Sequence, residues 1–333
     1  MKRRKKRVYL TRRLLEPAIS LLSKKYEIYI NEYERPPTKK ELIKSVRDID
    51  GILCTLSDKI DKEVMCAAGP NLKVISSYST GLDHIDVQDA TKRGIYVTFT
   101  GDILSEATAD LTFSLILALA RKIVEADKYV HEGLWNVGWM PDLFLGSDLC
   151  NKTLGILGLG KIGSAVARRA RGFNMNIIYH NRNSLNYNME TKLGARYVGI
   201  DNLLEESDFL SIHASLNKES FHLINKHKLK KMKSTAYLIN TSRGDIINQS
   251  HLVYALLNKW IAGAALDTFS HEPLDKSNRL LKLENVILLP HIGSATNGTR
   301  TKMSEIAARN LINVLEGKDP IYLVNSKVKN STR

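Results

Sequence analysis

The sequence of 333 residues contains little cysteine and no long apolar run. Its three cysteines, Cys54, Cys66 and Cys150, are odd in number and never lie in CxxC spacing. Neither a disulfide framework nor a zinc site is therefore indicated. The richest apolar segment, residues 111–120, is interrupted by hydroxyl side chains and falls short of the roughly 18 residues that a membrane span needs. We expect a protein without a metal site and without a membrane partner.

The basic N-terminal run, residues 2–7, lacks the apolar stretch and small-residue cleavage site of a secretory signal. We therefore expect a cytoplasmic protein. The formal net charge is +14, but acidic residues lie among the basic ones along the rest of the chain. This pattern favours solubility and attraction of small anions, and we expect no specific nucleic-acid partner.

The length and a hydrophobic content of 43% predict two domains. Short β-branched runs alternate with amphipathic helical patterns, which favours an α/β fold with parallel sheets built from βαβ units. The expected strands of the first series are 8–10, 27–30, 51–54, 74–77 and 96–98. Those of the second series are 153–157, 176–179, 209–213, 236–240, 264–267 and 286–289.

Two helical patterns flank the second series of strands. One long helix is predicted over 105–131, and another over 299–315, where Gly317 and Pro320 end it. If the second helix crosses back to the first series of strands, the C-terminus completes the first domain. We expect one domain at 1–100 and 292–333 and the other at 101–291, with ligands bound in a cleft between them.

A glycine-rich turn follows the predicted strand 153–157 and precedes a predicted helix. Such a turn lets the backbone approach a pyrophosphate closely and directs the helix N-terminus at the anion. Placed between strand and helix, the motif predicts dinucleotide binding. Its residues are Gly158, Gly160, Lys161, Ile162 and Gly163.

The sequence lacks the acidic residue expected at the end of the next strand, where a carboxylate would accept hydrogen bonds from the ribose hydroxyls of NADH. It has Asn181, Arg182 and Asn183 instead. A 2′-phosphate would meet hydrogen-bond donors and a cation there, so NADPH is preferred and NADH remains possible. The alternative is that Arg182 is one more exposed arginine.

Three successive strand ends in the second series carry Arg243, Glu272 and His291. The ends of parallel strands share one rim of a sheet, so these side chains are expected to gather there. Hydride transfer to a 2-keto acid needs a cation for the carboxylate, an acid for the carbonyl oxygen and a group that keeps this acid protonated. A carboxylate beside an imidazole favours the protonated imidazolium and fulfils the third requirement.

The motifs together resemble the D-isomer-specific 2-hydroxyacid dehydrogenase family, and most closely its glyoxylate/hydroxypyruvate reductases. The resemblance implies two Rossmann-like domains, a doubly wound parallel sheet for the dinucleotide and a smaller flavodoxin-like substrate domain. It also implies a homodimer. Trp139 resembles an aromatic that some relatives contribute to the partner's pocket, and the alternative is that Trp139 packs in the core or in an interface. The segments that carry the resemblance are 53–58, 79–86, 107–111, 158–163, 239–244, 272–273 and 290–296.

By this resemblance Arg243 binds the carboxylate and carbonyl of the substrate, His291 donates the proton, and Glu272 holds His291. Main-chain N–H groups around Thr80 and Gly81 grip the carboxylate. The substrate-binding set is Thr55, Thr80, Gly81, Arg243 and His291. The implied cofactor-binding set is Thr108, Gly158, Gly160, Lys161, Ile162, Gly163, Asn181, Arg182, Asn183, Ala214, Thr241, Ser242, Arg243, Asp267, His291 and Gly293, in which Asp267 meets the nicotinamide carboxamide and Thr108 lines the nicotinamide side.

The sequence departs from the family pattern in three places. Residues 99–102 read Phe-Thr-Gly-Asp instead of Asn-Thr-Pro-Gly, and residues 213–216 read His-Ala-Ser-Leu instead of His-Val-Pro-Leu. Thr55 stands where related reductases often have leucine. These differences affect cofactor affinity and the choice of substrate, and leave the reaction class unchanged.

The resemblance predicts an NAD(P)H-dependent reductase that converts glyoxylate to glycolate and hydroxypyruvate to D-glycerate. One alternative is another D-2-hydroxyacid dehydrogenase, acting on lactate, phosphoglycerate or phosphite. Phosphoglycerate enzymes often carry a further regulatory domain, for which we expect no room in a chain that ends at Arg333, but some of them lack this domain. The other alternative is a non-catalytic dinucleotide sensor like the corepressors that share this fold.

Overall fold

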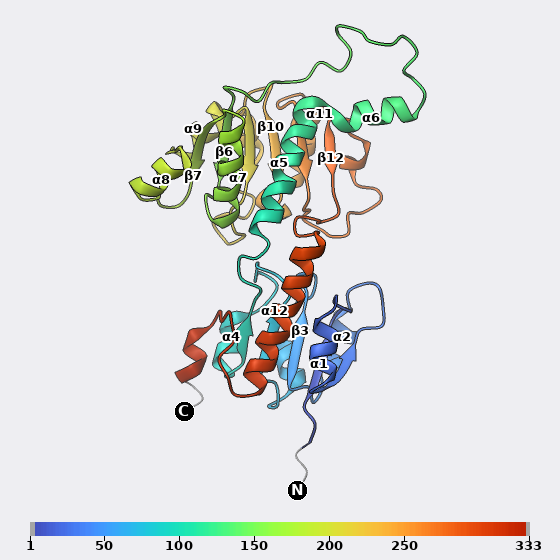
Figure 1. Ribbon diagram of the computed structural model, residues 1–333, viewed down its shortest axis with the longest axis vertical. Coiled ribbons are helices and arrows are strands. Elements are labelled where there is room, and N and C mark those ends of the chain that lie inside the picture. The colour runs from blue at the N-terminus through green and yellow to red at the C-terminus, as the bar shows by residue number, and fades with distance from the viewer. Residues whose placement is uncertain (1–3, 331–333) are drawn as a thin grey trace. The chain divides into compact units, whose positions relative to one another are not determined.

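The computed structural model describes residues 4–330, which form two compact α/β units (Figure 1). The first unit contains the chain up to Leu104 and again from Ala295 onward, and the second is Ser105–Ser294. Within residues 4–330, every helix is too short or too polar to serve as a transmembrane segment.

The first unit has a five-stranded sheet in the order β2-β1-β3-β4-β5, whose neighbouring strands pair in parallel. Its strands are β1 (Arg7–Leu10), β2 (Glu27–Ile30), β3 (Gly51–Cys54), β4 (Val74–Ser77) and β5 (Tyr96–Thr98). Its helices are α1 (Ala18–Ser23), α2 (Lys39–Ser45), α3 (Lys62–Ala68), α4 (Val87–Lys92) and α12 (Asn297–Leu315), and η3 (Ser326–Asn330) is a short 3-10 helix.

Helices cover both faces of this sheet, so the central strands are apolar on both sides. Ile52 and Ile75 pack on one face with residues of α2, α3 and α4. Leu53 and Val74 pack on the other face with residues of α1 and α12. The buried side chain of Asn310 on α12 donates to the carbonyl of Phe99 at 2.8 Å, so α12 is tied to the chain just after β5.

The second unit has a seven-stranded sheet in the order β12-β11-β10-β9-β6-β7-β8, again with parallel neighbours. Chain order reverses between β6 and β9, where open α/β sheets bind ligands. The strands are β6 (Thr153–Leu157), β7 (Asn176–His180), β8 (Ala195–Tyr197), β9 (Phe209–Ile212), β10 (Tyr237–Asn240), β11 (Gly263–Leu266) and β12 (Val286–Leu288).

Helices lie on both faces of the second sheet and enclose two apolar cores. The core under α5 and α7 includes Ile116, Ile156 and Val166, and the opposite core includes Leu203, Leu238 and Leu252. The helices are α5 (Ser105–Arg121), α6 (Ile123–His131), α7 (Lys161–Gly172), α8 (Tyr187–Leu193), α9 (Ile200–Glu206), α10 (Lys226–Leu229) and α11 (Gln249–Leu257), with short 3-10 helices η1 (Gly244–Ile246) and η2 (Arg279–Lys282).

The two-sheet α/β prediction is confirmed, and each predicted strand occurs with its ends shifted by at most one residue. The prediction of one unbroken helix over 105–131 was wrong. Lys122 adopts a left-handed conformation with φ of 51° and separates α5 from α6. Strand β8 was not predicted, because it is a three-residue edge strand in which Arg196 and Tyr197 are exposed.

Candidate functional site

The glycine-rich turn after β6 requires a residue without a side chain at Gly158. Its φ is +99°, and a Cβ there would lie 2.5 Å from the backbone nitrogen of Ala214, which follows β9. The turn therefore lies directly at the point where chain order reverses. Among the described residues, no side chain caps the N-terminus of α7 at Gly160. Its first N–H groups and the positive end of the helix dipole can therefore bind a phosphate.

The residues after β7 are arranged beside this turn. The side-chain oxygen of Asn181 accepts a hydrogen bond from the backbone N–H of Leu159 at 2.6 Å. Asn181 thereby fixes the turn. The sequence did not predict this role of Asn181. Arg182 is exposed and lies 3.8 Å from the carboxylate of Glu219, in the loop after β9. The cation expected for a 2′-phosphate therefore has a carboxylate neighbour.

The loop after β10 is folded by a buried asparagine. The side chain of Asn240 accepts from the backbone N–H of Ser242 at 3.0 Å and donates to the carbonyl of Arg243 at 2.9 Å. At Gly244 a Cβ would lie 1.9 Å from the carbonyl carbon of Phe269, so only glycine fits this close approach. The backbone beside Arg243 is thus packed against the loop that follows β11.

The loop after β11 carries Glu272, whose side chain bonds to His291 in the loop after β12. The Nδ1 of His291 lies 2.8 Å from Oε2 of Glu272, and the backbone N–H of Phe269 donates to Oε1 at 3.0 Å. The side chain of Glu272 is 28% exposed and that of His291 is 24% exposed, so ligands can still reach both. The bond occupies Nδ1, and Nε2 is the ring nitrogen that can exchange a proton with a ligand.

The electrostatics of the pair favour an ionised Glu272. Burial raises the pKa of this carboxyl group. The hydrogen bond and charge of His291, the N–H of Phe269 and the charge of Arg243 act in the opposite direction and outweigh burial. The net result is a pKa of Glu272 below its usual value. Arg243 and His291, predicted from two of the three strand ends, therefore both act on the carboxyl group of Glu272.

Asp267, at the end of β11, is buried and holds the turn that contains His291. Its two carboxylate oxygens accept from the backbone N–H groups of Ile292 at 2.7 Å and Gly293 at 2.8 Å. Burial raises the pKa of Asp267, although these hydrogen bonds and the charge of His291 oppose the shift. The structure thus gives Asp267 a role in the loop itself, next to its expected contact with the nicotinamide.

Helix α5 is attached to the loops after β10 and β12 by two buried threonines. The hydroxyl of Thr108 donates to the carbonyl of Gly293 at 3.2 Å. The hydroxyls of Thr112 and Thr241 are 2.8 Å apart. Thr112 was not among the predicted site residues, because its only signal in the sequence is its spacing of one helical turn from Thr108.

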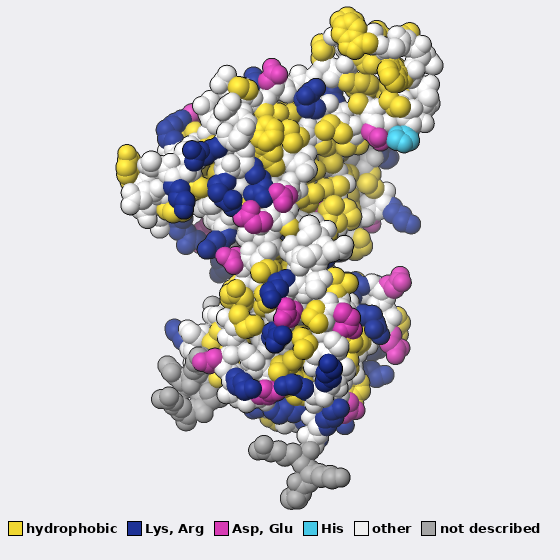
Figure 2. Space-filling view, viewed as in Figure 1, with side chains coloured by type: hydrophobic (Ala, Val, Ile, Leu, Met, Phe, Trp, Pro, Cys, Tyr) yellow, Lys and Arg dark blue, Asp and Glu magenta, His cyan; other side chains and the backbone are white. Residues whose placement is uncertain are grey.

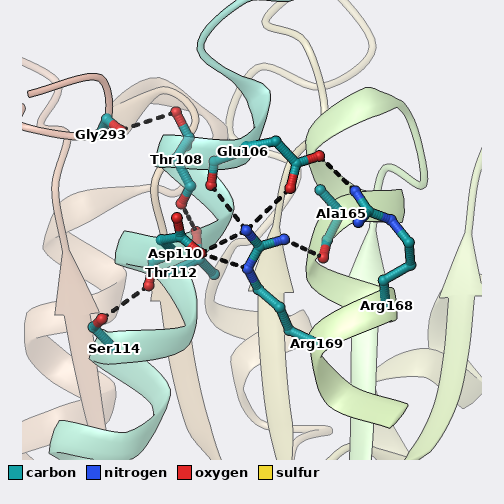
Figure 3. A network of polar contacts seen from close by, with 9 residues as sticks. All are labelled: Glu106, Thr108, Asp110, Thr112, Ser114, Ala165, Arg168, Arg169 and Gly293. Carbon is teal, nitrogen blue, oxygen red and sulfur yellow. Dashed lines mark hydrogen bonds and ion pairs between the residues drawn. The ribbon is translucent and has the colours of Figure 1, made fainter. Parts of the chain in front are cut away.

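A network of charges fixes the same helix to α7, as Figure 3 shows. Arg169 donates through Nε to Asp110 at 2.8 Å and through Nη2 to Glu106 at 3.0 Å. Its Nη1 donates to the carbonyl of Ala165 at 2.8 Å, and Arg168 pairs with Glu106. Helix α7 and the helix that carries Thr108 are therefore held together by these ion pairs.

A pocket adjoins the His291–Glu272 pair and has mostly apolar walls. An apolar wall lowers the local dielectric constant and strengthens the charge interactions within the pocket. No group of three histidine, cysteine or acidic side chains within residues 4–330 is placed to bind a metal ion. The pocket is lined by Phe269, Glu272, Pro273, Leu274, Leu288, Leu289, Pro290 and His291.

The remaining predicted residues lie in the first unit, at the carboxyl ends of β3 and β4. Thr55 follows β3 and bonds to Asp58 through both its backbone N–H and its hydroxyl, at 2.7 and 2.8 Å. Thr80 follows β4 and donates from its hydroxyl to the carbonyl of Gly101 at 2.7 Å. Thr55, Thr80 and Gly81 are partly exposed.

Comparison with known proteins identifies the family of the chain. Residues 113–293, more than half of the chain, match the D-isomer specific 2-hydroxyacid dehydrogenase NAD binding domain. The chain belongs to this family. It is 50% identical to a glyoxylate reductase of Thermofilum pendens, over 97% of this chain and 95% of the relative. It is 48% identical to a glyoxylate reductase of Korarchaeum cryptofilum, over 97% of each chain.

A crystal structure of a Sinorhizobium meliloti NADPH-dependent glyoxylate/hydroxypyruvate reductase, in complex with NADP and malonate, is also similar. Its identity is 30% and its TM-score 0.85, over 97% of this chain and 98% of that chain. The family resemblance inferred from the motifs is confirmed, and the protein is an oxidoreductase with a nicotinamide dinucleotide as cofactor. The side-chain-free turn at Gly158 and the uncapped start of α7 fit that cofactor.

The lowered pKa of Glu272 predicts a pH-dependent contribution to stability. A carboxyl group whose pKa is lower in the folded state stabilises the fold above its unfolded pKa, about 4.3, and loses this contribution as pH falls through the folded value. The difference in free energy of unfolding between the wild type and Glu272→Gln should therefore shrink below about pH 4.3. Urea unfolding at several pH values measures it, and a difference that stays constant on acidification contradicts the assignment.

Proposed function

We propose that the protein reduces small 2-keto acids, converting glyoxylate to glycolate and hydroxypyruvate to D-glycerate with NAD(P)H. The observation that carries the proposal is the 2.8 Å bond between Glu272 and His291, with the charge of Arg243 acting on the same carboxylate. The names of the two relatives with 50% and 48% identity support the choice of glyoxylate.

Arg243 binds the substrate's carboxylate and polarises its carbonyl oxygen, because a guanidinium offers several donors in one plane. When bound, the dinucleotide supplies a hydride to the carbonyl carbon. His291 donates a proton from Nε2 to the carbonyl oxygen, which becomes the hydroxyl group of the product. The neutral imidazole then takes a proton from solvent. Glu272 stays ionised throughout and holds the ring in one orientation.

The two units have different roles in this proposal. In the first unit, main-chain N–H groups of Thr80 and Gly81 hold the substrate's carboxylate, and Thr55 lies in the neighbouring loop. In the second unit, Thr108, Asp267 and Gly293 face the nicotinamide, and Ala214, Thr241 and Ser242 lie along the dinucleotide. The pyrophosphate binds at the turn formed by Gly158, Gly160, Lys161, Ile162 and Gly163.

NADPH is the preferred cofactor in this proposal, with NADH as a weaker substitute. No carboxylate directly follows β7, and Arg182 provides a charge for the 2′-phosphate, flanked by Asn181 and Asn183. Charge-assisted hydrogen bonds to phosphate are stronger than neutral ones. The NADPH dependence stated for the Sinorhizobium meliloti enzyme is consistent with this preference.

We also propose a homodimer, formed through α6 and the loop that follows it. Each residue of α6 is at least partly exposed, and Trp139 is 85% exposed. Figure 2 shows hydrophobic side chains gathered on this segment. Exposed apolar patches of this kind usually mark interfaces. The exposed apolar residues are Ile123, Val124, Val130, Leu134, Trp135, Val137, Trp139, Met140 and Leu145.

Arg243→Ala and His291→Ala should each lower kcat/KM for glyoxylate by about a hundredfold or more, because each removes a group that acts on the carbonyl. Absorbance of the reduced nicotinamide measures turnover, and fluorescence titration checks that nucleotide still binds. The matched control is His271→Ala, an exposed histidine in the loop of Glu272, which should keep wild-type rates. Near wild-type activity in either of the first two variants refutes the assigned role, and nucleotide binding without turnover of any 2-keto acid by the wild type favours a sensor.

Arg182→Ala should weaken NADPH binding about tenfold and change NADH binding by less than about twofold, because only NADPH has the 2′-phosphate. Nucleotide titrations followed by fluorescence measure both affinities. Arg196→Ala, which removes an exposed arginine bound to Glu206, is the control and should alter neither. Equal weakening of both nucleotides would show that Arg182 does not contact the phosphate.

The dimer should have twice the 37.5 kDa mass of the chain in light scattering. Trp139→Asp should shift the protein toward the monomer, since a charge in an apolar interface has no partner. Tyr187→Asp changes an aromatic on α8 that is 79% exposed, close to the value for Trp139, and should leave the dimer intact. A wild-type protein that is monomeric at all concentrations would rule out this assembly.

A further inference from the structure

The loop after β3 is organised around a buried carboxylate. Asp58 is 2% exposed, and its Oδ2 accepts three hydrogen bonds. The donors are the backbone N–H of Thr55 at 2.7 Å, the hydroxyl of Thr55 at 2.8 Å and the hydroxyl of Thr11 at 2.5 Å. Thr11 is itself buried at the end of β1. The loop after β3 is therefore held by hydrogen bonds to the buried carboxylate of Asp58.

These contacts determine the hydrogen-bonding polarity of Thr55. A threonine hydroxyl has one hydrogen and two acceptor lone pairs. The hydrogen of Thr55 is directed to Asp58, so only the lone pairs remain for another molecule. Thr55 is partly exposed at the carboxyl end of its strand, where parallel sheets bind ligands. Toward a ligand, the Thr55 hydroxyl can therefore act only as an acceptor.

This acceptor lies next to the loop assigned to the substrate's carboxylate. Cys54 and Ser77 are partners in the pairing of β3 and β4, and the N–H of Tyr78 donates to the carbonyl of Cys54 at 2.8 Å. Thr55 and the segment of Thr80 therefore leave adjacent strands side by side. In the proposed pose, a short 2-keto acid has its carboxylate at the loop of Thr80 and its third carbon toward Thr55.

We propose that Thr55 determines specificity by accepting a hydrogen bond from a hydroxyl group on the third carbon of the substrate. The protein then prefers 3-hydroxy-2-keto acids, such as hydroxypyruvate, to unsubstituted ones of the same size, such as pyruvate. An anionic substituent at this carbon is disfavoured, because it would meet lone pairs backed by the carboxylate of Asp58. This inference rests on the proposed 2-keto acid reduction.

The test compares kcat/KM for hydroxypyruvate and pyruvate, which differ by one hydroxyl group, at saturating nucleotide. Thr55→Val keeps the shape of the side chain and removes the acceptor, so the ratio should fall about tenfold, as expected for one neutral hydrogen bond. Thr55→Ser keeps the hydroxyl and should retain the ratio within about twofold. Thr11→Val removes another donor to Asp58 but leaves Thr55 in place, and should also retain the ratio.

A second measurement needs no turnover. With reduced nucleotide bound, which has no hydride acceptor in a 2-hydroxy acid, D-glycerate should raise the wild-type unfolding temperature more than D-lactate does, and Thr55→Val should abolish this difference. An unchanged ratio in Thr55→Val, or an equal loss for both substrates, overturns the inference while the proposed function stands. If the wild type reduces no 2-keto acid with either nucleotide, the proposed function itself has failed.

Discussion

The site depends on one hydrogen bond, between the imidazole of His291 and the carboxylate of Glu272. It occupies Nδ1, leaves Nε2 as the ring nitrogen that can exchange a proton with a ligand, and lowers the pKa of the carboxyl group. The bond joins loops from two strands and forms only if both loops are rigid. Asp267 fixes one of them through two backbone N–H groups, and the close approach at Gly244 ties the neighbouring Arg243 loop to the other.

The two units use the same means to fix their loops. A buried polar side chain near the carboxyl end of a strand binds backbone groups of the loop it supports: Asn240 and Asp267 in the second unit, and Asp58 in the first. The hydrogen bonds of Asn240 and of both oxygens of Asp267 lower the cost of burying these groups, whereas Oδ1 of Asp58 is buried without a partner among the described residues. Rigid loops on a scaffold of parallel strands are suited to bind small ligands.

The sequence predicted those parts of the molecule that depend on local patterns. Buried parallel strands appear in the sequence as apolar runs, and the glycine turn lies between a predicted strand and a predicted helix. The positions of the strands and of the turn therefore followed from the sequence. The end of α5 was missed because Lys122 adopts a left-handed conformation that its residue type does not suggest. The roles of Asp58 and Asn181 were missed because their partners are set by loop geometry, which periodicity does not encode.

The path of the chain has a consequence for how the protein folds. One core of the first unit combines Val8, Leu53 and Val74 with Leu311 on α12. These segments are separated by the whole of Ser105–Ser294. During synthesis, the ribosome completes the second unit before it has made α12. Until then α1 alone covers that apolar face of the nascent first sheet, which stays partly exposed, and chaperones have the most reason to act at that stage.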